Sequence, residues 1–148
     1  MELASLIPPD RVLVGLRARD KAQALSALAA RAAAALGMEA AAILAPLAAR
    51  EQLGSTGLGR GFALPHARVE RLDRFFGLFA RLARPVPFDA VDGQPVDLVC
   101  VLLIPASTGD DHVAALATIA RRMRDAATLA AIRAAPDAMR VHALLVEA

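Results

Sequence analysis

The stretch Val96-Asp97-Leu98-Val99-Cys100-Val101-Leu102-Leu103-Ile104 is apolar at every position except Asp97. A run of this kind predicts a central β-strand that is covered on both faces. Phe75-Phe76-Gly77-Leu78-Phe79-Ala80 is the second clear strand candidate. Residues Pro85 to Pro95, between the two strands, predict a turn-rich connection that is tightest at Asp92-Gly93. The fold is therefore expected to be organised around a sheet.

Two shorter strands are expected upstream. Val12-Leu13-Val14-Gly15-Leu16 predicts a short buried strand, and Phe62-Ala63-Leu64-Pro65 predicts a brief strand that ends at His66. The links between the last three predicted strands are too short to contain crossover helices. We therefore expect a mixed sheet rather than a purely parallel one.

Two helices are expected between the first strand and the second. Asp20 is a candidate N-cap, and Gln23 three positions later completes a capping-box pattern. Apolar residues at helical spacing follow until Gly37, which supplies a stop signal. A second helical stretch runs from about Glu39 to Gln52, and Pro46 should kink it or mark its restart.

The chain after Pro105 is expected to be helical to its end. Apolar residues recur there at helical spacing, and Pro136 opens a last amphipathic stretch. The residues concerned are Leu116, Ile119, Ala120, Met123, Leu129 and Ile132, then Met139, Val141, Leu144 and Leu145. The order of strand, two helices, three strands and further helices predicts a single-domain α/β fold over residues 1–148 with a mixed sheet.

Composition excludes several classes of protein. The 148 residues are 57% hydrophobic and carry a formal net charge of +2, which argues against a disordered chain. Tyr and Trp are absent, so base-stacking residues for nucleic acid are lacking. The longest uncharged run, Leu98 to Gly109, is too short for a membrane span, and the N-terminus has no basic stretch typical of a secretory signal. The single cysteine, Cys100, suits a reducing cytoplasm.

The cations are nearly all arginine, because Lys21 is the one lysine of the chain. Six arginines are concentrated in one quarter of the sequence, namely Arg60, Arg68, Arg71, Arg74, Arg81 and Arg84. They indicate either a solvated face or a local anion site. The second interpretation requires a partner motif.

A glycine-rich segment, Gly54 to Gly61, holds four glycines in eight residues. It is not a Walker A loop, because no Gly-Lys-Ser/Thr closes it, and its context is not that of a dinucleotide fingerprint. Its backbone N–H groups beside Ser55 and Thr56, with Arg50 and Arg60 flanking, can hold an anion. The alternative is a plain flexible turn.

The three histidines are His66, His112 and His142. No pair has the helical spacing of metal ligands, and His142 lies in the terminal amphipathic stretch, where we expect a structural role. Asp110-Asp111-His112 could donate oxygens and a nitrogen to a metal, but we favour Asp110 or Asp111 as the cap of the helix that carries His112. No metal site and no cofactor is therefore expected.

His66 follows the glycine-rich segment directly, and Pro65 stiffens the backbone that presents it. A neutral imidazole is available near pH 7 and can form a covalent bond to phosphorus. Phosphoryl transfer otherwise requires mainly positioning and charge neutralisation. His66 is therefore a plausible phosphoryl acceptor on its residues alone.

The segment from Arg50 to His66, Arg-Glu-Gln-Leu-Gly-Ser-Thr-Gly-Leu-Gly-Arg-Gly-Phe-Ala-Leu-Pro-His, is similar to the signature of enzyme IIA domains of the fructose/mannitol class. These domains belong to the bacterial phosphoenolpyruvate-dependent phosphotransferase system. The resemblance continues through Phe88–Leu98, Leu103–Ala106 and the spacing to His112, and it covers nearly the whole chain.

The resemblance implies a mixed central sheet flanked by helices on both faces. It also implies that His66 accepts a phosphoryl group at Nε2 from a small histidine-phosphorylated carrier protein of the HPr or NPr kind. His112 would donate a hydrogen bond to the phosphoryl oxygens, and Arg50 would help to hold the anion. The expected phosphoryl-binding loop consists of Gly54, Ser55, Thr56, Gly57 and Gly59.

The class has two functional branches. One passes the phosphoryl group to an enzyme IIB and so to a sugar, while the nitrogen-type regulatory branch controls target proteins through its phosphorylation state. The loop and the Asp92–Leu98 segment look most like the nitrogen type. Pro46 in a helix, and Ala114 where some members of that branch have a further histidine, depart from the pattern. A binding module without phosphotransfer and a metal hydrolase are further alternatives.

Overall fold

Strand β6 (Val96–Pro105) is the centre of the sheet in the computed structural model, which describes residues 2–147. It pairs antiparallel with β5 (Phe76–Val86) and parallel with both β3 (Phe62–Ala63) and β4 (His66–Val69). β1 (Val12–Leu16) lies parallel to β5 at one edge, and β2 (Gly57–Gly59) pairs antiparallel with β3. The sheet order is β1-β5-β6-β3-β2, with β4 also on β6, so the predicted mixed sheet is confirmed.

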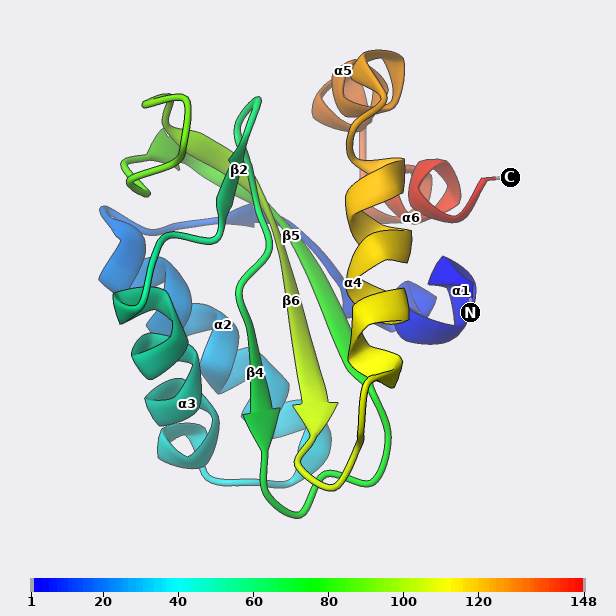
Figure 1. Ribbon diagram of the computed structural model, residues 1–148. Coiled ribbons are helices and arrows are strands. Elements are labelled where there is room, and N and C mark those ends of the chain that lie inside the picture. Colours follow the sequence, from blue (N-terminus) through cyan, green and yellow to red (C-terminus); the bar gives the residue numbers. More distant parts are fainter. Residues whose placement is uncertain (1, 148) are drawn as a thin grey trace.

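Helices cover both faces of this sheet. α2 (Lys21–Leu36) and α3 (Ala40–Gln52) form one layer. The other layer contains α1, α4, α5 and α6 (Figure 1), which span Leu3–Leu6, Asp111–Arg122, Ala126–Ala134 and Ala138–Val146. A short 3-10 turn, Pro9–Arg11, leads from α1 into β1. The α/β architecture flanked on both faces is therefore as expected.

Each face of β6 contributes to a different hydrophobic core. Val99, Val101 and Leu103 pack into the core under α2 and α3. The alternate residues pack into the core under α1, α4, α5 and α6, and these are Leu98, Cys100, Leu102 and Ile104. Residues Leu98 to Leu103 are completely buried, as the uninterrupted apolar run predicted.

β3 and β4 follow one register along β6, because Phe62 pairs with Leu98 and His66 with Leu102. Leu64 and Pro65 interrupt the ladder between them without shifting it. Side chains alternate between faces, and Ala67 lies in the core under α2 and α3. His66 therefore belongs to the face covered by α4.

Several strand predictions need correction. His66 begins β4 instead of following the end of a strand, and the glycine-rich segment contains β2, so it is part of a hairpin with β3. β5 extends to Val86, six residues beyond the predicted end at Ala80, because its later part pairs with β1 and, after a bulge, with β6. β1 is an edge strand of which Val12 alone is buried.

The predicted start and end of α2 are confirmed. Asp20 caps α2 by accepting a hydrogen bond from the Gln23 N–H at 2.8 Å, and Gly37 ends the helix in the left-handed conformation. α3 continues through Pro46 as one helix, so the restart is wrong. Met139 is 83% exposed and lies outside the apolar face of α6.

Gly77 in β5 tests the packing of α1 on the sheet. A Cβ added there would lie 2.6 Å from the carbonyl oxygen of Leu6 and 2.8 Å from Ile7 Cγ1, so backbone would have to move. We predict that Gly77→Ala lowers the free energy of unfolding by about 1–3 kcal/mol, measured by urea denaturation. Gly109→Ala is the control, because nothing lies within 4 Å of its added Cβ. Equal stability of the two variants would contradict this packing.

Candidate functional site

The backbone directly before His66 fixes its imidazole. Nδ1 lies 2.8 Å from the carbonyl oxygen of Leu64. Because a carbonyl oxygen only accepts hydrogen bonds, Nδ1 carries the proton of the neutral ring. Nε2 then carries the lone pair, and Leu64 and Pro65 are both buried, which holds this geometry rigid. The half-buried ring therefore presents one defined nucleophilic nitrogen.

Four surrounding groups and burial set the charge state of His66. Burial of the ring lowers its pKa below 6.5, and the charges of Arg50 and His112 act in the same direction. The hydrogen bond to Leu64 and the negative charge of Glu51 partly oppose this shift. The net direction is downward, so the neutral imidazole predominates at pH 7.

His66 lines a pocket of about 280 Å³ at the edge of the sheet where β4 lies. The pocket has contributions from the end of α3, from the glycine-rich segment and from α4. Its other lining residues are Arg50, Ser55, Thr56, Leu58, Leu64, Leu116, Ala117 and Ala120. Residues from both helical layers thus meet around one imidazole.

Arg50 is the one basic residue in the last turn of α3. Its Nη1 donates to the carbonyl oxygen of Gly54 at 2.9 Å, which ties the guanidinium to the start of the glycine-rich segment. The same side chain lines the pocket and influences the pKa of His66. The structure therefore brings a fixed positive charge to the predicted acceptor.

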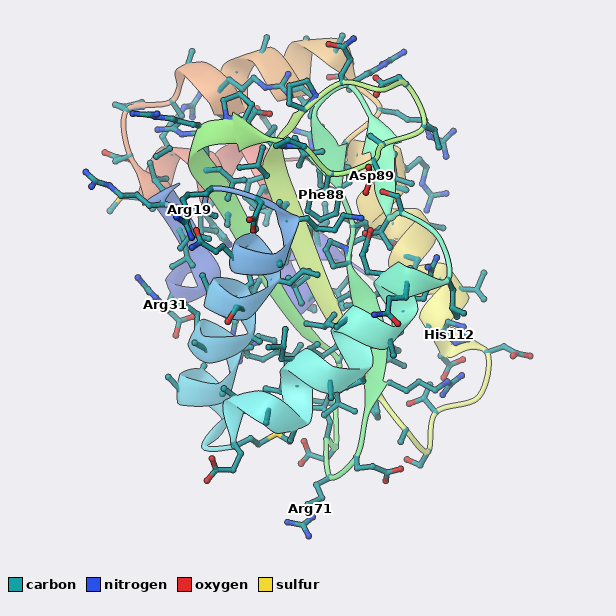
Figure 2. The ribbon with its side chains drawn as sticks, turned by 90° about the vertical axis from the view of Figure 1, so that its left-hand side faces the viewer. Arg19, Arg31, Arg71, Phe88, Asp89 and His112 are labelled. Carbon is teal, nitrogen blue, oxygen red and sulfur yellow. The ribbon has the colours of Figure 1, made fainter. Side chains whose placement is uncertain are left out.

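His112 lies in the first turn of α4, on the side of the molecule shown in Figure 2. It is one turn before the pocket residue Leu116, so the two occupy the same face of the helix. Its Nδ1 lies 3.0 Å from the carbonyl oxygen of Gly109 and 3.4 Å from Arg68 Nη2. The contact with the Gly109 carbonyl is the shorter of the two, so we assign the ring proton to Nδ1. Nε2 then has no protein partner among these contacts.

Arg68 supports His112 indirectly. It is one of the six arginines that are concentrated in one quarter of the sequence. From β4 its guanidinium donates to the carbonyl oxygens of Thr108 and Gly109, the latter at 3.1 Å. These bonds fix the turn that leads from β6 into α4. Alternation along β4 predicts that residues 66 and 68 share a face, but no pattern indicated that Arg68 would hold this turn.

Glu51 is a second residue that the sequence did not reveal. Its side chain is 5% exposed and accepts hydrogen bonds from the Thr56 N–H at 2.9 Å and the Thr56 hydroxyl at 2.6 Å. Lys21, the first residue of α2, neutralises it at 3.1 Å. The buried carboxylate therefore folds the glycine-rich segment back onto α3 behind the pocket.

The glycine-rich segment shapes the pocket in a different way from the one expected. The N–H groups of Thr56 and Gly57 bond to Glu51 and to the Ser55 hydroxyl, and the Gly54 N–H bonds to the Glu51 carbonyl. The Ser55 hydroxyl itself donates to the Phe88 carbonyl at 2.6 Å. The N–H groups of Gly54, Thr56 and Gly57 are therefore already used within the protein, contrary to the expectation that they are free for an anion.

The glycines are needed for space and for backbone conformation. A Cβ at Gly57 would lie 2.7 Å from the Cβ of Ala90. Gly59 has a positive φ of 102°, and a Cβ added there would lie 3.3 Å from Oδ2 of Asp92.

The remaining chemical candidates lie apart from His66. His142 Nε2 bonds to the Ile7 carbonyl at 2.9 Å, which confirms its structural role. Asp110 occupies the N-cap position of α4 but makes no side-chain capping bond. Among residues 2–147 no group of three or more His, Cys, Asp or Glu side chains could hold a metal, and no helix is long and apolar enough to cross a membrane.

Comparison with known proteins shows the family of the chain. Residues 5–148 match the family described as phosphoenolpyruvate-dependent sugar phosphotransferase system, EIIA 2. The chain belongs to this family. A nitrogen regulatory protein from Bradyrhizobium diazoefficiens is 45% identical over 98% of this chain and 95% of its own length. The nitrogen regulatory protein of Escherichia coli is 31% identical over 99% and 91%, respectively.

Solved structures show the same EIIA fold. The nitrogen regulatory protein IIA-Ntr from Neisseria meningitidis superimposes with a TM-score of 0.90 at 29% identity, covering 97% of this chain and 98% of that one. The IIA mannitol protein of Escherichia coli gives a TM-score of 0.78 at 19% identity over 94% and 98%, which shows the fold alone. This chain is thus an EIIA-type component of the phosphotransferase system, with nitrogen regulatory proteins among its relatives.

Glu51 offers a test of the electrostatics of the site. Because its negative charge raises the pKa of His66, we predict that Glu51→Gln lowers that pKa further below 6.5, as measured by NMR titration of the His66 ring. Glu70→Gln is the control, since Glu70 is exposed and is not among the groups that shift His66. An unchanged or raised pKa in Glu51→Gln would show that Glu51 does not act on the imidazole.

Proposed function

We propose that Nε2 of His66 accepts a phosphoryl group from a histidine-phosphorylated carrier protein of the HPr or NPr kind. The observation that carries this proposal is the 2.8 Å contact of Nδ1 with the Leu64 carbonyl, which leaves the lone pair on Nε2. The lowered pKa keeps that lone pair available at neutral pH. Residues 1–148 act as one EIIA domain in this proposal.

The transfer balances without an additional proton donor. The Nε2 lone pair forms the new N–P bond, while the P–N bond to the carrier breaks and its electron pair returns to the carrier's imidazole. The His66 ring keeps its Nδ1 proton and gains positive charge as the bond forms. The Leu64 carbonyl stabilises that charge through the same hydrogen bond that raises the pKa.

Arg50 and His112 would then stabilise the phosphoryl oxygens. The guanidinium of Arg50 already lines the pocket, and with Nη1 bonded to the Gly54 carbonyl it still has further N–H donors for the anion. His112 has its Nδ1 proton directed to Gly109, so its Nε2 donates a hydrogen bond when the ring is protonated. The glycine-rich segment, through Ser55 and Thr56, forms a wall of the same pocket.

A protein partner has an apolar surface to dock on around this pocket. Leu53, Leu58 and Val113 are 84%, 50% and 59% exposed, and they belong to the glycine-rich side and to α4 next to His112. We call these three residues the apolar rim. Large exposed apolar side chains beside a polar centre are typical of protein interfaces. The rim therefore fits a carrier protein, and then a downstream protein, placed over His66.

The output we propose is regulatory, with the phosphorylation state of His66 controlling the binding of target proteins. Support comes from relatives of 31–45% identity that are named nitrogen regulatory proteins. The alternative is a sugar-specific enzyme IIA that passes the group to an enzyme IIB, as the family's description allows. Neighbouring genes for enzymes IIB and IIC would favour that alternative. Buried, unpaired Cys100 is compatible with action in the cytoplasm.

The phosphoacceptor is tested with purified enzyme I, carrier protein and labelled phosphoenolpyruvate. We predict that the wild-type chain gains one acid-labile phosphoryl group and that His66→Gln gains none, because the only proposed nucleophile is removed. His142→Gln is the matched control, since His142 bonds to the Ile7 carbonyl and should leave labelling intact. Labelling of His66→Gln to the wild-type level would overturn the proposal.

His112 is expected to affect rate rather than extent. We predict that His112→Ala slows transfer by about 100-fold yet reaches the same final labelling, measured in a rapid-quench time course. The exposed neighbour Asp111 provides a control, because Asp111→Ala leaves the imidazole in place. Wild-type kinetics in His112→Ala would mean that His112 does not stabilise the phosphoryl group.

A further inference from the structure

A second cleft, of about 620 Å³, lies at the other edge of the sheet from His66. Three arginines line it, Arg17 and Arg19 from the segment after β1 and Arg84 from β5. Gln23 and the small residues Ala18, Ala83 and Pro85 complete its wall. No acidic side chain is among these lining residues.

The fold brings Arg84 next to Arg17 and Arg19, although Arg84 is distant from the other two in the sequence. β1 and β5 are parallel neighbours, and Leu16 pairs with Leu82. The residues that follow Leu16, and those that follow Leu82 within β5, therefore lie side by side, next to the first turn of α2. Figure 2 shows Arg19 at this end of α2, on the opposite side of the view from His112.

Unlike the guanidiniums of several other arginines of the chain, those of the cleft are not used in structural contacts among the described residues. Arg81 donates to the Ile132 carbonyl at 2.8 Å, and Arg133 pairs with Asp97 at 2.8 Å. By contrast, no side-chain hydrogen bond or ion pair of Arg17, Arg19 or Arg84 occurs within residues 2–147. Three exposed positive charges in one concave site repel one another, and a multivalent anion relieves that repulsion.

The surrounding charges leave the cleft positive. The carboxylate nearest in sequence is Asp20, which accepts the Gln23 N–H at 2.8 Å as the cap of α2. The N-terminus of a 16-residue helix adds positive potential at the same place. Against three guanidiniums, one capping carboxylate does not reverse the sign of the potential.

We propose that this arginine cleft binds a small anion that carries two or more phosphate groups. Guanidinium groups match phosphate oxygens in a planar, two-bond geometry. The cleft offers three of them and is much larger than a single phosphate requires. Its lining contains no aromatic ring on which a base could stack, so the phosphates are the part that is recognised.

The cleft is separate from the phosphoryl pocket. Strands β5 and β6 lie between β1 and β4, which corresponds to about 14 Å across the sheet. The six arginines crowded in the sequence are also separated in the structure. Of these six, Arg84 alone lines the cleft, and its partners Arg17 and Arg19 come from another part of the chain.

The test uses the full chain and sodium triphosphate as the probe, in isothermal titration calorimetry. We expect saturable binding of one triphosphate per chain, weaker binding of orthophosphate, and weakening with added salt. The double variant Arg17→Gln/Arg84→Gln should bind triphosphate about tenfold more weakly or worse. Loss of affinity in this variant, with folding checked by circular dichroism, supports the proposal.

Arg31→Gln/Arg71→Gln is the matched control, because it removes the same charge from two exposed arginines outside the cleft. Figure 2 shows Arg71 pointing away from the body of the molecule. An equal loss of affinity in the control would overturn the proposal, since net charge alone would then explain binding. NMR shift mapping adds a second readout: changes at residues 17–23 and 83–85 support the cleft, whereas changes confined to residues 50–56 and 66 would overturn it.

Discussion

The burial of β6 on both faces is the constraint on which the rest of the structure depends. Its alternate residues belong to two different cores, so neither face can be exchanged with the other. A slip of one residue in β4 against β6 would turn every side chain of β4 to the opposite layer. His66 would then point into the core under α2 and α3. The apolar pattern of β6 therefore determines on which face the imidazole appears.

The site depends on a balance between two opposite requirements on the His66 ring. Burial and the charges of Arg50 and His112 favour the neutral ring that the proposed transfer requires, whereas a phosphorylated ring would need its positive charge stabilised. The Leu64 carbonyl and the Glu51 carboxylate would stabilise that positive charge. The Leu64 carbonyl contacts His66 Nδ1 directly, and the Thr56 N–H holds the Glu51 carboxylate in place. Glu51 is itself neutralised by Lys21, so the buried charge is paired.

The sequence predicted those features whose signal is local. The apolar run of β6, the Asp20 cap and the Gly37 stop each depend on side chains near one another in the chain. The β2–β3 hairpin was not predicted, because Gly57 and Gly59 have no side chains that could form a strand pattern. Glycine is required at these positions because residues 90–92 approach closely. The role of Glu51 and the arginine cleft were not predicted either. The burial of Glu51 and the meeting of the distant segments that form the cleft both result from tertiary packing, which has no local sequence signal.

Phosphorylation would act locally and not through the net charge of the chain. A dianionic phosphoryl group on a ring that keeps its Nδ1 proton would lower the formal net charge from +2 to +1. At physiological ionic strength, however, charges more than about 8 Å apart in solvent are largely screened. The arginine cleft lies beyond that range across two strands, whereas Leu58 of the apolar rim lines the pocket that holds His66. A partner that distinguishes the two states would therefore have to contact the surface next to His66.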